Sequence, residues 1–193
     1  MTIQAILAAA EARFSEQGLH AAHMNDIAAG AGVAVGTLYN YFKDRESLLA
    51  SLMDARKREL LARIDEAIES SQGTPFRERL KILLTAILEH AQAHRQFLSI
   101  LWQGEIGRYE NMFPSACQVP SATVGDIFRR LEKVMKQGAK EKALRPELVE
   151  LAPMLFVGMV RAVAIRGMLG GTASEFTSER DRLLSFFLDG AAL

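Results

Sequence analysis

The sequence has little of several features on which other protein classes depend. Its 193 residues include one cysteine, Cys117, which excludes an internal disulfide and favours a reducing compartment. Only five prolines are present, and no segment alternates between apolar and polar residues as a half-buried strand does. Net charge is also absent, with 23 basic and 23 acidic residues. These absences argue against a disulfide-rich secreted domain, a β-sheet protein and a chain that binds polyanions through its overall charge.

Long apolar runs and targeting signals are missing as well. The most apolar stretch, Leu148 to Leu169, is interrupted by Glu150, Pro153, Arg161 and Arg166. Such interruptions favour a buried helix over a membrane span. The first residues show no charged leader followed by an apolar run, so no signal peptide is visible. We therefore expect a cytoplasmic protein without a membrane partner.

Motifs of catalysis and metal binding are scarce. The sequence contains no glycine-rich phosphate loop and no nucleophile elbow. His20 and His23 are three residues apart, and His90 and His94 are four apart. The second pair could share a helix face and bind a metal with a third ligand, but no carboxylate motif accompanies it, and chance spacing is the preferred interpretation. We expect no enzymatic activity, no cofactor and no metal.

The segment Asp26 to Asp44 is the most informative part of the chain. Its residues predict two short helices joined by a tight turn, with Gly32 supplying the left-handed backbone that ends the first helix. Leu38 and Phe42, four residues apart, would anchor the second helix on a core. This arrangement is typical of a helix-turn-helix, whose second helix lies in the DNA major groove. The alternative is that the polar residues of that helix, Tyr39, Asn40 and Tyr41, are ordinary exposed side chains.

The segment Gly32 to Leu49 closely resembles the TetR family of bacterial transcriptional regulators. The likeness begins earlier, at Ile6 to Ala10 and at Phe14 to Gly18, and the stretch Leu144 to Leu148 is also similar. The resemblance implies an all-α fold with an N-terminal three-helix helix-turn-helix head and a C-terminal helical body for ligand binding and dimerisation.

The resemblance also implies which side chains meet DNA. In TetR-like proteins one set of matching residues contacts phosphates, and a second set lies near base edges. Hydroxyls and cations suit phosphate oxygens, and an asparagine amide can bond adenine at two atoms. The expected phosphate contacts are Thr37, Tyr39, Tyr41, Lys43 and Arg45, and the residues expected near base edges are Asn25, Val35, Gly36 and Asn40.

Two positions depart from the family pattern. Arg45 stands where the family usually has lysine, which keeps the charge and adds donors. Ala22 and His23 replace the usual Thr-Ser pair, so the hydroxyl cap of the first motif helix is missing. Asn25 could cap that helix instead, and His23 is a cap, an exposed residue or a phosphate contact.

Charge in the expected head is balanced, which is unusual for a DNA-binding domain. We therefore expect modest non-specific DNA affinity with a shallow salt dependence. The charged residues through Arg45 are Arg13, Lys43 and Arg45 on the basic side and Glu11, Glu16, Asp26 and Asp44 on the acidic side.

We expect two domains, a DNA-binding domain over residues 1–46 and a ligand-binding and dimerisation domain over residues 47–193. Apolar residues make up 49% of the chain, and their spacing traces about nine helices. Beyond the head the expected helices run from Arg45 to about Glu69, from Pro75, from His94 to Glu105, from Ser121 to Lys142, from Pro146 to the pair Gly170-Gly171, and from a capping box at Thr172 to Glu175.

The last two expected helices are apolar on nearly all sides, and such a helix must be buried on all sides. TetR-like proteins dimerise by packing two such helices from each subunit, so the resemblance implies a homodimer. The alternative is that both helices only close the core of the monomer. The expected interface residues are Leu155, Met159, Val163, Leu183, Leu184 and Phe187.

The middle of the chain supplies aromatic and soft apolar side chains that suit a pocket for a largely apolar small molecule. The same side chains are as well explained as ordinary core residues. The expected effector-binding residues are Phe97, Trp102, Glu105, Tyr109, Met112, Phe113, Phe128 and Met159.

The sequence therefore predicts a ligand-responsive regulator. In this interpretation a homodimeric repressor binds a palindromic, double-stranded operator and is released by a small-molecule effector. The alternative is a dimeric helical sensor that acts through a protein partner without tight DNA binding, and the lack of basic charge is the feature that favours it.

Overall fold

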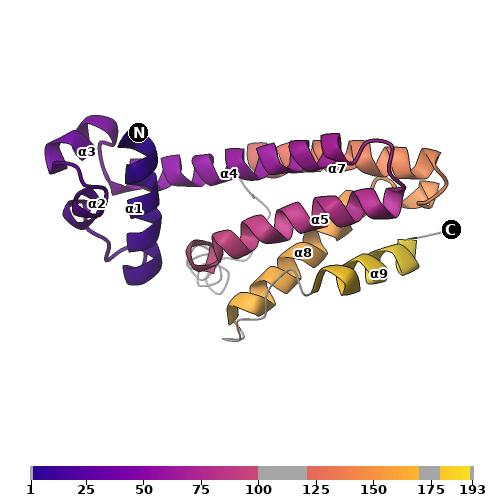
Figure 1. The fold of residues 1–193 in the computed structure, drawn as a ribbon. Helices are drawn as coiled ribbons and strands as arrows, with labels where there is room; N and C mark the ends of the chain where they lie inside the picture. Colours follow the sequence, from indigo (N-terminus) through magenta and orange to yellow (C-terminus); the bar gives the residue numbers. More distant parts are fainter. Residues whose placement is uncertain (1, 100–120, 170–178, 192–193) are drawn as a thin grey trace. The chain divides into compact units, whose positions relative to one another are not determined.

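The chain is helical throughout the part that the computed structural model describes, which is residues 2–99, 121–169 and 179–191 (Figure 1). No strand occurs in these ranges, as the sequence predicts. A helical stretch also covers residues 95–99, at the edge of the first range. The other elements are α1 (Thr2–Gln17), α2 (Met24–Gly30), α3 (Val35–Tyr41), α4 (Arg45–Ser70), α5 (Phe76–Ala93), α7 (Ser121–Lys140), a 3-10 turn η1 (Pro146–Leu148), α8 (Ala152–Leu169) and α9 (Arg180–Ala191).

The described residues divide into two compact units. The first contains residues 2–59 and 96–99, and the second contains residues 60–95, 121–169 and 179–191. The division therefore falls within α4, whereas the sequence placed a domain boundary after residue 46. The reason is that Leu48 and Leu52, in the first turns of α4, belong to the same buried cluster as the residues of α1 to α3.

The first unit is organised around one apolar cluster. The α1 residues of this cluster recur with helical spacing, so they form a single face of the helix. Leu38 of α3 is completely buried and Phe42 nearly so, which confirms that they anchor the second motif helix. The cluster contains Ile6, Leu7, Ala10 and Phe14 of α1, Met24, Ile27 and Ala28 of α2, Leu38, Phe42, Leu48 and Leu52, together with Ala22 and Phe97.

The turn between α2 and α3 has the predicted backbone. Gly32 has a φ of +67°, in the left-handed region that favours glycine. The Val33 N–H donates to the Ala28 carbonyl at 3.0 Å, and this bond closes the end of α2. The glycine thus fixes where α2 stops and where α3 can start.

Asp44 caps the N-terminus of α4. Its Oδ1 accepts a hydrogen bond from the Ser47 N–H at 2.7 Å, and its own N–H donates to Ser47 Oγ at 3.1 Å. This reciprocal pair satisfies two backbone donors at the helix start, as in a capping box. The hydrogen bonds from Ser47 lower the pKa of Asp44 because they favour the ionised carboxyl group.

The second unit is a helical layer in which α5 contacts both α8 and α9, and α7 contacts α8 (Figure 1). Phe156 of α8 and Phe187 of α9 meet edge to face with ring centroids 5.4 Å apart. Near the start of α5, the ring of Phe76 lies 2.4 Å from where a Cβ of Gly138 would be. The glycine therefore permits α7 to approach α5 closely.

Two helix starts differ from the expected positions. Pro75 is the cap of α5 and not its first residue. Pro146 opens η1, and α8 begins only at Ala152, directly ahead of Pro153. Because proline has no N–H, Pro153 is tolerated only in the first turn of a helix, which sets the start of α8. The expected stop at Gly170-Gly171 and the capping box at Thr172 to Glu175 lie outside the described residues. None of the described helices is long and apolar enough to cross a bilayer.

Candidate nucleic-acid interface

The α3 helix presents its polar aromatic side chains outward. Tyr39 and Tyr41 are 50% and 48% exposed, and Asn40 between them is also exposed. Leu38, on the opposite side, is buried in the cluster of the first unit. One face of a two-turn helix is thus fixed by packing, and the other face is left with two phenol hydroxyls and an amide.

The start of α3 is open on its outer side. Val35 and Thr37 are half-buried, and Gly36 is exposed with no atom within 4 Å of where its Cβ would be. Gly36 does not have a positive φ; among the glycines that the structure describes, Gly18, Gly32 and Gly73 do. Neither the backbone nor the internal packing therefore requires glycine at this position. The absence of a side chain at Gly36 leaves room for close approach of another molecule, and its place near base edges stays a prediction.

Neither His23 nor Asn25 caps the N-terminus of α2 with its side chain. His23 occupies the N-cap position and makes no side-chain capping hydrogen bond. Asn25 lies inside the first turn of α2 and is exposed, so it is not the cap. Its amide is therefore on the surface of the unit, as contact with a base edge would require.

Arg45 is already engaged within the protein. Its Nη1 donates to the carbonyl of His20 at 2.5 Å, and its Nη2 lies 3.1 Å from Glu46 Oε1. These contacts tie the connection between α1 and α2 to the start of α4. The sequence assigned Arg45 to phosphate, and the structure shows that the guanidinium also has an internal use.

The first unit neutralises its own arginines. Within residues 2–59, each arginine lies within ion-pair distance of a carboxylate, whereas Lys43 is exposed just after α3. The basic surface near α3 is consequently small. The pairs are Arg13 with Glu16, Arg45 with Glu46, Arg56 with Glu11, and Arg58 with Asp54.

The expected effector residues are not brought together in the described part of the chain. Phe97 is 1% exposed within the apolar cluster of the first unit, and its role as an effector residue stays a prediction. Phe128 of α7 and Met159 of α8 are half-buried in the second unit. The remaining expected residues, Trp102, Glu105, Tyr109, Met112 and Phe113, lie outside the described residues.

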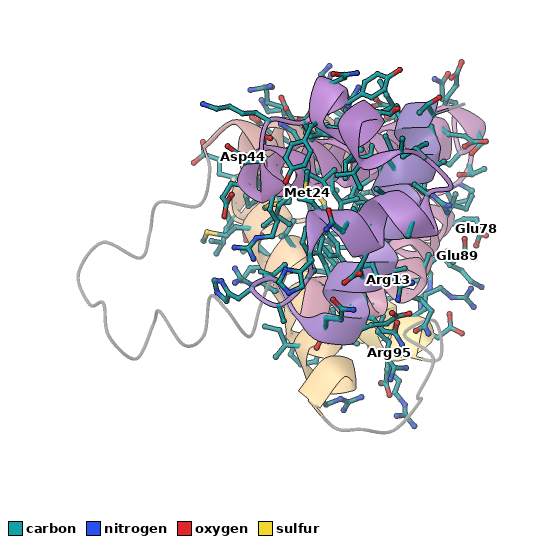
Figure 2. All side chains as sticks on the ribbon, turned by 90° about the vertical axis from the view of Figure 1, so that its left-hand side faces the viewer. Arg13, Met24, Asp44, Glu78, Glu89 and Arg95 are labelled. Carbon is teal, nitrogen blue, oxygen red and sulfur yellow. The ribbon has the colours of Figure 1, made fainter. Side chains whose placement is uncertain are left out.

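The second unit contains a polar cleft of about 410 Å³ that the sequence did not indicate. Glu78 and Glu89, three helical turns apart, point to the same side of α5 (Figure 2). Of the expected effector residues that the structure describes, Phe97, Phe128 and Met159, none lines the cleft. The lining residues are Arg63, Glu66, Ala67 and Ser70 of α4, Glu78, Lys81, Ile82, Thr85, Ala86 and Glu89 of α5, and Arg180 of α9.

The exposed apolar residues of the second unit gather on two helices in contact with each other. In the described part of this unit, the large apolar side chains that are exposed are Leu151, Met154, Leu155 and Phe186, on or next to α8 and α9. We call these four residues the α8–α9 face. Phe186 is 75% exposed, and it is not among the expected interface residues.

The expected dimer residues differ in how exposed they are within a single chain. Leu184 and Phe187 are buried within a single chain, and their assignment to an interface stays a prediction. They pack inward because α9 turns this side towards α8, as the Phe156–Phe187 contact shows. Leu155 is exposed, and the other expected residues, Met159, Val163 and Leu183, are half-buried.

Comparison with known proteins gives one consistent result. A family described as bacterial regulatory proteins, tetR family, matches residues 6–52. The transcriptional repressor KstR2 of Mycobacterium tuberculosis is 31% identical over 147 residues, which span 74% of this chain and 69% of that protein. The transcriptional regulator YhgD of Bacillus subtilis is 29% identical over 159 residues, 82% of this chain and 80% of that protein.

A solved structure has the same fold over almost its full length. The FadR regulator of Bacillus subtilis, in complex with stearoyl-CoA, superposes with a TM-score of 0.79 at 22% identity, covering 97% of this chain and 98% of that one. The likeness therefore extends beyond the helix-turn-helix to the helices of the second unit.

Proposed function

Because the chain belongs to the tetR family of bacterial regulatory proteins, we propose that it is a repressor that binds a palindromic operator as a homodimer. The observation that carries the proposal is the outer face of α3, where Tyr39, Asn40 and Tyr41 are exposed on a helix anchored by Leu38. Asn25, Val35, Gly36 and Thr37 would approach the duplex beside them. Operator binding would place its action in the cytoplasm.

Dimerisation is supported by the α8–α9 face. Exposing Leu151, Met154, Leu155 and Phe186 to water is unfavourable, and a second copy of the chain would cover them. A two-fold dimer also gives two recognition helices related by the symmetry of a palindromic site. A monomer with one seven-residue recognition helix would have half of the contacts.

Release is proposed to occur through a small, largely apolar effector. The FadR structure holds stearoyl-CoA, which carries a long acyl chain, and this supports an apolar effector for a chain of the same fold. Effector binding would favour a state whose two heads no longer match the operator. Near-complete release needs about a 10⁴-fold preference of the effector for that state. The helix α4, which starts in the first unit and ends in the second, is one of the covalent connections between them.

The test is a fluorescence-anisotropy titration of the full chain against DNA from upstream of its own gene and against random duplexes, at two salt concentrations. Tight binding that persists for one sequence at the higher salt supports the repressor. Binding that is equally weak for every duplex and is erased by salt contradicts it. Stearoyl-CoA and free fatty acids of graded length, added to the complex, then test whether an apolar ligand lowers the anisotropy.

A further inference from the structure

Two histidines at the end of α5 lie close enough for one ion to reach both. His90 and His94 are four residues apart, and the His94 N–H donates to the His90 carbonyl at 3.2 Å, so the helical register continues through His94. Their ring centroids are 4.7 Å apart, with the planes inclined at 55°. One ring nitrogen of each lies within 4.8 Å of the other.

This spacing suits a metal chelate. Histidines at positions i and i+4 share a helix face and hold Zn²⁺ in helical metal sites. Zn–N bonds of about 2.0–2.1 Å place two nitrogens of a tetrahedral site roughly 3.3 Å apart. The observed upper limit of 4.8 Å exceeds that separation by about 1.5 Å, so the two rings would move towards each other when an ion binds.

The surroundings of the pair also favour a site. His90 is 5% exposed, whereas His94 is half-buried at the C-terminal end of the helix. Burial restricts the first ring before any ion arrives, and the partial exposure of the second leaves a path for entry. His20 and His23, the other two histidines of the chain, are exposed and do not share a helix.

We propose that His90 and His94 form a chelating site for a divalent transition-metal ion such as Zn²⁺, and that the bound ion stabilises the last turn of α5. Neutral imidazole nitrogens are good ligands for zinc, copper and nickel, and water or further ligands complete the coordination. The sequence alone favoured chance spacing. The structure changes that interpretation because it keeps the helical register, brings the rings together and buries one of them. The site is independent of the proposed function, since it requires neither DNA nor an effector.

The test uses the untagged full chain, stripped of metal and titrated with Zn²⁺ by calorimetry and with Co²⁺ by absorption. His94→Gln is the main variant because its side chain is only half-buried, and His90→Gln is the second. The double variant with His20→Gln and His23→Gln is the matched control, since it also removes two imidazoles. We expect one ion per chain, a loss of at least about tenfold in affinity for His94→Gln, and no loss for the control.

Thermal unfolding gives a second readout. Zn²⁺ at a hundred times its Kd should shift the unfolding equilibrium about a hundredfold in the wild type and the control, and raise their Tm. At the same zinc concentration His94→Gln should show a shift of about tenfold or less, while it keeps the helical circular dichroism of the wild type. X-ray absorption of the zinc-loaded chain should show two imidazole ligands. Equal zinc affinity in His94→Gln and the wild type, a loss confined to the control, or a zinc spectrum without imidazole would overturn the site.

Discussion

The α3 helix and the α8–α9 face both expose large side chains, but the side chains differ in kind. On α3 they are Tyr39 and Tyr41, whose rings carry hydroxyl groups. On the α8–α9 face they are leucines, a methionine and a phenylalanine, which offer no hydrogen bond. A hydroxyl suits a hydrated surface lined with phosphate oxygens, and an all-apolar face suits a dry contact between proteins. We therefore expect the two surfaces to suit different classes of partner.

The largest expected effect is on the α8–α9 face. Replacing Met154 and Leu155 by aspartate should convert a dimer to a monomer, because two charges would be buried without partners in the contact. Sedimentation velocity measures the change in mass. Both side chains are exposed in the single chain, so the variant should keep its helical content.

The matched control is the exposed Met53 of α4, in the other unit. Met53→Asp adds a charge of the same kind and should leave the dimer intact. A dimer that survives the change at Met154 and Leu155 would show that the α8–α9 face is not the interface and that another surface pairs the two chains.

The second effect is on the exposed face of α3. Tyr39→Phe removes one hydroxyl and keeps the ring, so operator affinity should fall by roughly 1.5–3 kcal/mol if the hydroxyl bonds a phosphate. Tyr39→Ala should not be much worse, since the ring is half-exposed and anchors little of the core. Fluorescence anisotropy measures the affinity, and sedimentation should show an unchanged dimer. Wild-type affinity in Tyr39→Phe would mean that the hydroxyl does not meet DNA.

A smaller effect separates phosphate contact from positioning. Lys43 is exposed, whereas Arg45 bonds the His20 carbonyl and Glu46. The slope of log K against log salt is negative, and removing one phosphate contact makes it less steep by about 0.9. Removing a positioning residue lowers the affinity equally at every salt concentration. We expect Lys43→Gln to make the slope less steep and Arg45→Gln to leave it unchanged. A less steep slope in Arg45→Gln would show that the guanidinium leaves His20 to meet DNA.

The sequence predicted the first unit better than the second for a physical reason. The turn at Gly32 and the anchor at Leu38 and Phe42 depend on a few neighbouring residues, so a short pattern specifies them. In contrast, α9 has apolar residues on several sides, and only the packing against α8 decides that Phe187 is buried and Phe186 exposed. The family relationship, confirmed by the relatives, supplied the fold of the body but not these orientations.

The same distinction applies to Phe97 and to the cleft of the second unit. Phe97 was assigned to an effector pocket because it is aromatic, but its burial comes from a cluster whose other members lie far away in sequence. The polar cleft was missed because charged residues on α4 and α5 are ordinary for exposed helix faces, and only the fold brings Glu78 and Glu89 of α5 to one cleft with Arg180 of α9. Long-range packing is the part of the structure that no local pattern contains.

The smallest effect tests how the N-terminus of α4, just after α3, is capped. The hydrogen bonds from Ser47 lower the pKa of Asp44 from its ordinary value of 3.8, so the ionised cap stabilises the folded state above that pH. This contribution is lost as pH falls through the lowered pKa, because the protonated cap binds the Ser47 N–H less well. Asp44→Ala should therefore have a lower Tm than the wild type at pH 7, and the difference should narrow below about pH 4.

Asp44→Asn keeps an acceptor for Ser47 and loses the charge, so its Tm deficit at pH 7 should be smaller than that of alanine. A deficit of Asp44→Ala that stays constant from pH 7 to pH 3, measured by thermal unfolding, would show that the cap does not depend on the charge of Asp44, and that the start of α4 is held by the burial of Leu48 instead.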